Sequence, residues 1–476
     1  MRRTAFLCFS LLLMVTSSLL LSLNGCGSST TTIIPPGTIK HVVIIFQENR
    51  TPDNLFQDPV LIANHADIAS SGMNSLGQTV PLTAGPLGTN YDISHAHHAF
   101  VLMYDGGKMD GADLIPVGCN QGATNCPPPN PQFWSVNPSE VKPYFDLAEQ
   151  YTFGDRMFQT NQGPSFPAHQ FIISGTSAPT PPGNPTSNLF IAENAGGIPS
   201  AGNQTGCLAP PAEFVYLIDP NGSEATNQAI YPCADHPTLT DELNAKGISW
   251  RYYTPSAGSL WTGPNAIQHM CGPNNPPPNA TACIGSDWVN SVVIPETKVL
   301  TDITSGNLAQ VSWVIPTGDN SDHAGNVNGT GGPSWVASIV NAIGTSSYWS
   351  DTAIIITWDD WGGWYDHVPP YSIVNDGTSW GSGYVYGFRV PLIVVSPYAK
   401  AGYISHVNHD FGSILNLVEK TFSLPSLGYA DAATTDDLSD CFDFNQTPLQ
   451  FKSISAQRNA EYFLNDKSPR TDPDDD

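Results

Sequence analysis

Three continuous apolar segments, rich in β-branched residues, constrain the fold of this chain more than any other feature. They are residues 41–47 (HVVIIFQ), 352–358 (TAIIITW) and 390–396 (VPLIVVS). None shows the alternation of apolar and polar residues that is typical of a strand with one solvated face. We therefore expect all three to be buried parallel strands in a sheet that is covered on both faces. Residues 311–316 are a weaker fourth candidate.

Helical patterns occur at residues 141–149, 238–246, 334–343 and 413–422. Strands that alternate with helices predict an α/β fold with a mostly parallel central sheet, flanked by helices on both faces. Two stretches rich in Pro, Gly and Asn, residues 178–235 and 256–287, are expected to be loop-rich insertions and not independent domains.

The polar residues that follow two of the predicted strands indicate where the chemistry lies. Glu48 and Asn49 follow the first strand, and Asp359 and Asp360 follow the strand at 352–358. In an open α/β sheet, ligands bind beyond the carboxyl ends of the strands. Three carboxylates and an amide at one edge suit a hard or borderline divalent cation, because all of them supply oxygen. Either pair alone is more often a solvated loop or a helix cap, but two clusters at matching strand ends favour a metal site.

The charge of the chain excludes one class of partner. The sequence carries 17 Lys and Arg against 42 Asp and Glu, a formal net charge of -25. Binding to nucleic acid depends on clustered basic residues. We therefore expect no nucleic-acid partner.

The N-terminus has the pattern of an export signal, residues 1–25. Arg2 and Arg3 precede an apolar run that contains no acidic residue. The run ends in Leu-Asn-Gly-Cys, which resembles the cleavage box of bacterial lipoproteins, with Cys26 as the lipidated first residue of the mature chain. A plain secretory signal is the alternative. We expect an exported protein, held in the bacterial cell envelope by a lipid anchor, with residues 26–38 as a tether.

The cysteines agree with an oxidising compartment. Their spacing suggests three local disulfides, Cys119–Cys126, Cys207–Cys233 and Cys271–Cys283. Connectivity is not deducible from sequence, and zinc binding is the alternative, although no Cys-x-x-Cys spacing supports it. Cys441 is left over, and we expect a buried free thiol.

Five segments carry a resemblance to a known family. They are HVVIIFQENRTPDNLF (41–56), GGKMDGA (106–112), GPSFPAHQ (163–170), WDDWGGWYDHVPP (358–370) and RVPLIVVSPYAKAGYISH (389–406). In this order they resemble the bacterial phosphoesterase family, which contains non-haemolytic phospholipases C and a group of acid phosphatases within the alkaline phosphatase superfamily. The resemblance implies an alkaline phosphatase-like catalytic domain at residues 39–456, followed by a polar and acidic tail at 457–476.

The resemblance also implies roles for individual residues. Glu48 and Asn49 correspond to the first ligands of one divalent metal ion. Asp359 and Asp360 correspond to the second pair of ligands. Ser165 falls at the position that serves both as nucleophile and as metal ligand.

Two histidines match histidines of the family's active site. His95, in DISHAHHAF, matches the family's Asp-Pro-x-His segment with Ile93 in place of the Pro, and His323 matches a second histidine. After the second proline of GPSFPAHQ the family has Asn and then Arg or His, whereas Ala168 and His169 stand here. Any phosphate contact that relatives make at that position is therefore not carried over.

Together these residues form a coherent site for phosphoryl transfer. A serine hydroxyl is a weak nucleophile at neutral pH, and coordination to a metal ion stabilises its alkoxide. Imidazole, with an ordinary pKa of about 6.5, can protonate a departing alcohol. We expect Ser165 to attack phosphorus, His323 or His95 to protonate the alcohol, and water to hydrolyse the phosphoserine. Calcium, magnesium, manganese and zinc all remain candidates for the metal.

The substrate stays open between a phospholipid head group and a phosphomonoester. Aromatic residues near the acidic pair are candidates for caging a choline head group through cation–π contacts, although packing is the commoner role: Trp358, Trp361, Trp364 and Tyr365. Lys108 is a candidate substrate contact, with an ion pair to Asp110 as the alternative. His367 is a second candidate, with orientation of the adjacent Gly-Gly loop as its alternative.

A different class of function is a catalytically silent surface lipoprotein that keeps the fold for binding. Loss of a metal ligand or of the nucleophile would mark such a protein. None of these residues is lost in this sequence.

Overall fold

The computed structural model describes residues 34–179, 189–196, 204–218, 224–370, 386–434 and 436–468. The chain divides into two units, residues 1–31 and 32–476, and all described residues belong to the second. The signal peptide at 1–25, the lipidation site Cys26 and most of the tether at 26–38 lie outside the described residues, so they stay predictions.

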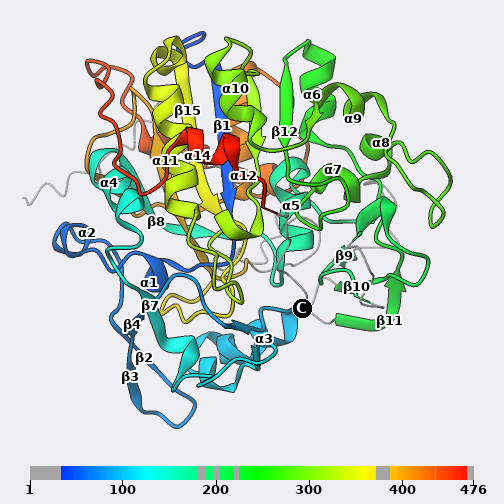
Figure 1. Cartoon of the computed structure of the whole chain (residues 1–476). Helices are drawn as coiled ribbons and strands as arrows, with labels where there is room; N and C mark the ends of the chain where they lie inside the picture. Colours follow the sequence, from blue (N-terminus) through cyan, green and yellow to red (C-terminus); the bar gives the residue numbers. More distant parts are fainter. Residues whose placement is uncertain are drawn as a thin grey trace, which may run out of the picture. The chain divides into compact units, whose positions relative to one another are not determined.

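A nine-stranded sheet forms the centre of the second unit (Figure 1). Eight strands follow the order β13-β12-β14-β1-β15-β16-β8-β17, and β18 pairs with β8. The strands from β13 to β15 are parallel, which confirms the mostly parallel α/β sheet. Their bounds are β13 Val292–Val293, β12 Trp250–Tyr253, β14 Val311–Val314, β1 His41–Gln47, β15 Thr352–Trp358, β16 Arg389–Val395, β8 Thr152–Phe158, β17 Tyr403–Ser405 and β18 His409–Asp410.

The prediction of a parallel strand at residues 390–396 is wrong in direction. β16 runs antiparallel to both of its neighbours, β15 and β8. All of its residues are buried, and burial on both faces is what produces a continuous apolar segment. The apolar composition of this segment therefore indicates that the strand is buried but does not indicate its direction.

Helices cover both faces of the sheet, as the side chains at the end of β1 show. Successive strand residues point to opposite faces. The Phe46 ring packs against His169 of α5 (Ser165–Ser174) and Phe411 of α12 (Phe411–Phe422). Gln47 donates a hydrogen bond to the hydroxyl of Tyr144 of α4 (Lys142–Gln150). Thus α5 and α12 cover one face and α4 the other.

Neighbouring helices complete the two layers (Figure 1). α6 (Leu239–Lys246) packs against α5, and α13 (Ala430–Ala433) against α12. On the opposite face, α11 (Gly332–Gly344) packs between α4, α10 (Lys298–Thr304) and α14 (Ala460–Asn465). The four predicted helices are present as α4, α6, α11 and α12.

Part of the segment predicted as a polar and acidic tail, residues 457–476, is helical. α14 lies within that range, and its Phe463 is 1% exposed and packs edge-to-face on Trp335. A single buried aromatic residue on a short polar helix gives too weak a pattern to be recognised in the sequence. Residues 469–476 lie outside the described residues.

The loop-rich insertions hold a small sheet and several short helices. These elements are β9 (Phe190–Ile191), β10 (Val215–Ile218), β11 (Glu224–Ile230), α7 (Gly263–Ala266), α8 (Gln268–Cys271) and α9 (Ser286–Ser291). The predicted disulfides Cys119–Cys126, Cys207–Cys233 and Cys271–Cys283 are all present. Cys441 is a buried free cysteine, as expected.

A second, smaller core lies under the segment between β1 and α4. The helices and strands of this segment are α1 (Pro52–Leu55), α2 (Pro59–Ala63), β2 (Ser71–Met73), β3 (Thr79–Pro81), β4 (Thr83–Gly85), β5 (Tyr91–Ile93), α3 (His97–Tyr104), β6 (Val117–Cys119) and β7 (Trp134–Val136). Trp361 and Trp364, which follow β15, are buried in this core. Among the helices of the described ranges, none has both the length and the apolar composition that crossing a bilayer requires.

Candidate active site

Three adjacent parallel strands bring the predicted site residues to one edge of the sheet. Gln47 at the end of β1 is level with Trp358 at the end of β15, so Glu48 and Asp359 are the next residues on each strand. β14 pairs with β1 on its other side, and the loop that follows β14 carries His323. The sheet thus places predicted ligands from separate parts of the chain beyond the carboxyl ends of its strands.

Asn49 donates two hydrogen bonds, one from its backbone and one from its side chain. Its backbone N–H donates to Asp359 Oδ1 (2.9 Å), and its side-chain Nδ2 lies 3.0 Å from His95 Nε2. His95 Nδ1 lies 2.9 Å from the carbonyl oxygen of Ile93, which only accepts, so Nδ1 carries the proton and Nε2 accepts from Asn49. His95 therefore holds the Asn49 amide in the orientation in which Nδ2 faces the imidazole and Oδ1 points away from it.

Ser165 is the first residue of α5 and is fully buried. Its Oγ lies 3.2 Å from Asp360 Oδ2 and 3.4 Å from Glu48 Oε2. A hydroxyl has one proton and can satisfy only one of these carboxylates at a time. The partial positive charge at a helix N-terminus stabilises negative charge on the same oxygen. The hydroxyl thus lies between two carboxylates at the start of a helix.

The start of α5 is held in place by two asparagines that sequence reasoning missed. Asn161 Nδ2 donates to the carbonyl oxygens of Gly163 (2.8 Å) and Pro164 (3.1 Å). Asn194, from an insertion, accepts the backbone N–H of Phe166 through Oδ1 (2.9 Å). The helix itself was missed because two prolines flank Ser165, although proline is tolerated in a first helical turn.

The donor set fits a divalent cation. Glu48, Asn49, Ser165, Asp359 and Asp360 are all 0% exposed. Asp359 Oδ2 and Asn49 Oδ1 are buried oxygens with no hydrogen-bond partner among the described residues. Buried acceptors without a donor are rare, and an ion is one of the few things that satisfies them. These oxygens, with the two carboxylates beside Ser165, form an oxygen-rich cradle of the kind that hard or borderline cations occupy.

His323 reaches the site on a tightly fixed loop. Asp322 has a φ of 78°, which a residue with a side chain adopts only under constraint. Arg50 supplies the constraint, because Nε and Nη2 donate to the Asp322 carbonyl oxygen at 2.8 and 2.6 Å. The Asp322 carboxylate accepts from the hydroxyl of Tyr144 (2.7 Å). Burial raises the pKa of Asp322 to about 6, although its hydrogen bond from Tyr144 and the charge of Arg50 oppose that rise.

The rings of His323 and His95 lie close together but are held differently. Their centroids are 5.7 Å apart. His323 Nδ1 lies 2.6 Å from the carbonyl oxygen of Ala324 and therefore donates to it. The proton that His323 can exchange is consequently on Nε2, whereas Nε2 of His95 accepts from Asn49.

Position 362 requires glycine because the backbone of Asn49 lies very close to it, and not only because the chain turns there. Its φ is 62°, and a Cβ at this position would lie 2.4 Å from the carbonyl oxygen of Asn49. Its N–H donates to Asp360 Oδ1 at 2.7 Å, which leaves Oδ2 facing Ser165. The glycine thus orients the Asp360 carboxylate and leaves room for the backbone of Asn49.

The two predicted substrate contacts lie outside this group. Lys108 is exposed and pairs with Asp105, not with Asp110. His367 has Nδ1 2.7 Å from Asp53 and Nε2 3.0 Å from Asp67, so both ring nitrogens already have acidic partners. The geometry gives no support to a substrate contact at either residue.

His367 belongs to a second acidic cluster that is neutralised by protein groups. Burial lowers the pKa of His367, but hydrogen bonding to Asp53 and the charges of Asp53 and Asp366 outweigh it and raise the pKa to about 9. Arg389 Nε donates to Asp366 (2.9 Å) and its Nη2 to Asp53 (3.3 Å). The carboxylates of this cluster therefore have basic side chains of the protein as their partners.

The aromatic residues near the acidic pair are packing residues. Trp358, Trp361 and Trp364 are at most 1% exposed, and Tyr365 is 4% exposed. Trp361 packs edge-to-face on Phe388, and the Arg50 guanidinium lies 4.8 Å from the Trp364 ring centroid. The suggested choline cage is therefore not formed by these side chains.

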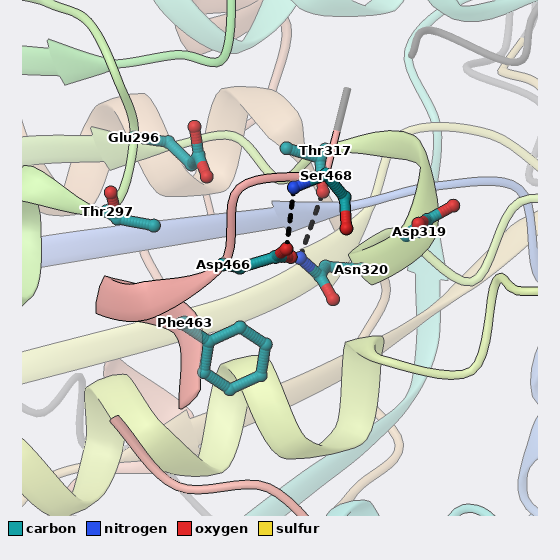
Figure 2. A pocket seen from close by; sticks show the side chains of 8 residues that line it. All are labelled: Glu296, Thr297, Thr317, Asp319, Asn320, Phe463, Asp466 and Ser468. Carbon is teal, nitrogen blue, oxygen red and sulfur yellow. Dashed lines mark hydrogen bonds between the residues drawn. The ribbon is translucent and has the colours of Figure 1, made fainter. Parts of the chain in front are cut away.

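The loop after β14 also borders a small polar hollow (Figure 2). It is lined by Glu296, Thr297, Thr317, Asp319, Asn320, Phe463, Asp466 and Ser468. None of these described residues belongs to the group around Ser165. The hollow is a separate feature, where the C-terminal segment packs on the loop.

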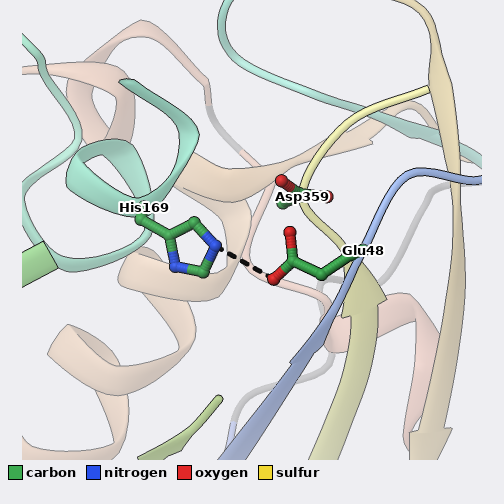
Figure 3. Close-up of side chains that lie close together, drawn as sticks. All are labelled: Glu48, His169 and Asp359. Carbon is green, nitrogen blue, oxygen red and sulfur yellow. Dashed lines mark hydrogen bonds and ion pairs between the residues drawn. The ribbon is translucent and has the colours of Figure 1, made fainter. Parts of the chain in front are cut away.

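His169 was not assigned a role from the sequence, and the structure places it in the site. It lies one turn after Ser165 on α5, and its Nε2 is 3.1 Å from Glu48 Oε1 (Figure 3). Residues four apart on a helix share a face. Recognition of α5 as a helix would therefore have placed His169 beside the nucleophile.

Comparisons with known proteins identify a family and related sequences. A model of the phosphoesterase family matches residues 39–425. The non-hemolytic phospholipase C of Pseudomonas aeruginosa is 25% identical over 267 residues, which cover 50% of this chain and 37% of that protein. Phospholipase C B of Mycobacterium tuberculosis is 24% identical over 454 residues, which cover 86% of this chain and 78% of that protein. The match thus spans much less than two thirds of the first relative and more than two thirds of the second.

Solved structures also resemble the chain. A Vibrio parahaemolyticus protein of the alkaline phosphatase superfamily is 12% identical, with 83% of this chain and 70% of that chain covered and a TM-score of 0.34. The lipoteichoic acid synthase LtaP of Listeria monocytogenes is 10% identical, with 85% and 79% covered and a TM-score of 0.36.

Replacement of the buried Arg50 tests whether its hydrogen bonds fix the His323 loop. We expect Arg50→Lys to lower the free energy of unfolding by about 3 kcal/mol, since lysine cannot replace the forked donors and leaves buried acceptors unsatisfied. Arg156→Lys, in a half-exposed pair with Asp67, is the control and is expected to change it by less than about 1 kcal/mol. Denaturant unfolding at pH 7 measures both. Equal losses would contradict the account of the loop.

Proposed function

This chain belongs to the phosphoesterase family, which confirms the predicted enzyme class, and we propose that it hydrolyses phosphate esters through a phosphoserine at Ser165. The first step forms a bond between Ser165 Oγ and phosphorus, breaks the bond between phosphorus and the oxygen of the departing alcohol, and releases that alcohol with a proton from His323; a diester leaves its second ester group on the phosphoserine. The second step transfers the phosphoryl group from Ser165 to water. No nucleic-acid partner is expected, given the acidic charge of the chain.

The observation that carries the proposal is the position of the Ser165 hydroxyl. It lies at the N-terminus of α5, buried, and within 3.4 Å of carboxylates from two different strand ends. A serine with a purely structural role would donate to one acceptor and need no second carboxylate. The arrangement supports a nucleophile whose negative charge is stabilised by its surroundings.

Five residues are proposed to hold one divalent cation: Glu48, Asn49, Ser165, Asp359 and Asp360. When bound, such an ion supplies charge neutralisation for the serine alkoxide and for the transferring phosphoryl group. His95 keeps the Asn49 amide in the orientation that presents Oδ1. Gly362 keeps Asp360 Oδ2 directed at Ser165.

His323 is proposed as the group that protonates the departing alcohol. Its Nδ1 is committed to the Ala324 carbonyl, so Nε2 is the nitrogen that gives up a proton. After that transfer the neutral ring is a base, and it can take a proton from the water that attacks phosphoserine. His95 is proposed as a positioning residue, because its Nε2 accepts from Asn49.

The proposed substrate is a phosphate diester with a lipid alcohol, with phosphomonoesters as the alternative. Its support is the name of the relatives, which are phospholipases C. The local geometry supports cleavage of the phosphate ester in either case. We further propose that the protein is exported and anchored through lipid on Cys26, which rests on the N-terminal sequence alone.

Removal of the nucleophile and of the metal tests the chemistry. With para-nitrophenyl phosphorylcholine as substrate, we expect Ser165→Ala to lower kcat by a factor of about 10³ or more. Chelation of the metal should abolish the activity of the wild-type protein, and addition of Mn²⁺ or Zn²⁺ should restore it. Ser174→Ala, a buried serine at the other end of α5, is the matched control and should keep full activity.

Release from para-nitrophenyl phosphate alone would make the enzyme a monoesterase. Full activity of Ser165→Ala would refute the phosphoserine step. Absence of hydrolysis of either ester by the metal-loaded protein would favour the silent binding protein.

Substrates with different leaving groups distinguish the roles of His323 and His95. Nitrophenolate leaves without a proton, whereas an alkyl alcohol needs one. We expect His323→Ala to slow cleavage of an alkyl phosphorylcholine ester by about 10²-fold and of the nitrophenyl ester by less than about tenfold. His95→Ala should slow both esters equally, because it disturbs Asn49. Steady-state kinetics of both variants decide this, and the opposite pattern would exchange the two roles.

Lipidation is tested in cells that carry the full chain. We expect radiolabelled palmitate to be incorporated into the wild-type protein and the protein to sediment with membranes. Cys26→Ser should lose the label and appear in the soluble fraction, whereas Cys8→Ser, inside the signal, should not. Unlabelled wild-type protein in the soluble fraction would support a plain secretory signal.

A further inference from the structure

The contact between His169 and Glu48 is the strongest feature of the site that the proposed function does not use. His169 is 0% exposed, and its Nε2 lies 3.1 Å from Glu48 Oε1 (Figure 3). The Phe46 ring packs edge-to-face on the imidazole, with centroids 4.9 Å apart. The backbone of Gly263 approaches so closely that a Cβ there would lie 2.4 Å from the His169 carbonyl oxygen. The ring is therefore fixed in its orientation.

The hydrogen bonds of Tyr252 determine the tautomer of His169. The Tyr252 hydroxyl donates its one proton to the carbonyl oxygen of Trp261 at 2.8 Å. It accepts the backbone N–H of Gly263 at 3.2 Å. His169 Nδ1 lies 3.3 Å from the same oxygen and must donate to it, since the hydroxyl proton is already used. A neutral His169 therefore carries its lone pair on Nε2.

That lone pair is directed at a carboxylate. His169 Nε2 and Glu48 Oε1 lie 3.1 Å apart; the contact is an ion pair when both ring nitrogens carry a proton, and a ring protonated on Nδ1 alone offers Nε2 as a ligand atom beside the carboxylate. Asp359 adds a third donor atom, and one atom from each of the three side chains lies within 4.8 Å of the others (Figure 3). Ligands bound at about 2.0–2.2 Å to one ion have this spacing.

We propose that His169 Nε2 is a ligand of the same divalent cation and that it biases the site toward zinc or manganese over calcium. The inference rests on the proposed metal site and deepens it by naming the ion class. Calcium takes oxygen ligands almost exclusively, whereas a ring nitrogen suits borderline ions. Tyr252 completes the arrangement, because a metal-binding histidine commonly donates its other N–H to a fixed acceptor.

Pulsed electron paramagnetic resonance of the Mn²⁺-loaded full chain tests this directly. Coupling between Mn²⁺ and a histidine nitrogen appears as modulation of the echo, and its frequency changes when the histidines are labelled with ¹⁵N. We expect this coupling in the wild-type protein and its loss in His169→Gln. The control is His236→Gln, a buried histidine that contacts Ser174 and the Ala178 carbonyl; it should keep the coupling.

Binding constants give a second readout that does not depend on catalysis. We expect His169→Gln to weaken Zn²⁺ binding by at least about tenfold, while Ca²⁺ binding changes by less than about threefold. Tyr252→Phe keeps the packing but removes the acceptor of Nδ1–H, and it should weaken Zn²⁺ binding by about tenfold. This variant tests the proposal even where His169→Gln fails to fold.

The outcomes separate this inference from the proposed function. Mn²⁺ bound without any histidine coupling in the wild-type protein would refute the His169 ligand and leave the oxygen site intact. Coupling that persists in His169→Gln would refute it in the same way. No bound Mn²⁺ at saturating concentration would refute the proposed metal site and this inference together.

Discussion

Burial of carboxylates beside a single serine governs how the site is built. Glu48 and Asp360 both approach the Ser165 hydroxyl within 3.4 Å, and Asp359 leaves one buried oxygen without a donor. Uncompensated buried charge is strongly unfavourable. In the neighbouring cluster the same problem is solved by Arg389 and His367. Around Ser165, Asp359 Oδ2 and Asn49 Oδ1 are buried oxygens with no hydrogen-bond partner among the described residues, and these two oxygens are why we infer a cation.

The scaffold that presents these groups is rigid. β14, β1 and β15 are parallel neighbours in fixed register, so the loops that follow them meet at one edge. Each loop is then fixed by a second set of contacts: Arg50 holds the backbone before His323, and His95 sets the Asn49 amide. Placement of reacting groups on strand ends, with supporting hydrogen bonds, is how enzymes preorganise a site.

The sequence predicted the strands at 41–47 and 352–358, and with them the position of the acidic and amide residues that follow each strand, because buried parallel strands have a characteristic composition. It predicted the wrong direction for β16, since a strand that is buried on both faces has the same apolar pattern whether it is parallel or antiparallel to its neighbours. It missed α5, whose prolines suggest a turn, and with it the position of His169. It left open the roles of His367 and the tryptophans, because a motif gives spacing but not the partners that a side chain contacts in three dimensions.

The central claim is that one cation joins ligands from three places in the chain. Anomalous diffraction from crystals grown with Mn²⁺ tests it most directly. The account predicts a peak within bonding distance of Glu48, Asn49, Asp359, Asp360 and Ser165. A peak among Asp53, Asp366 and His367, the other group of possible ligands in the described residues, or no peak at saturating Mn²⁺, would contradict it.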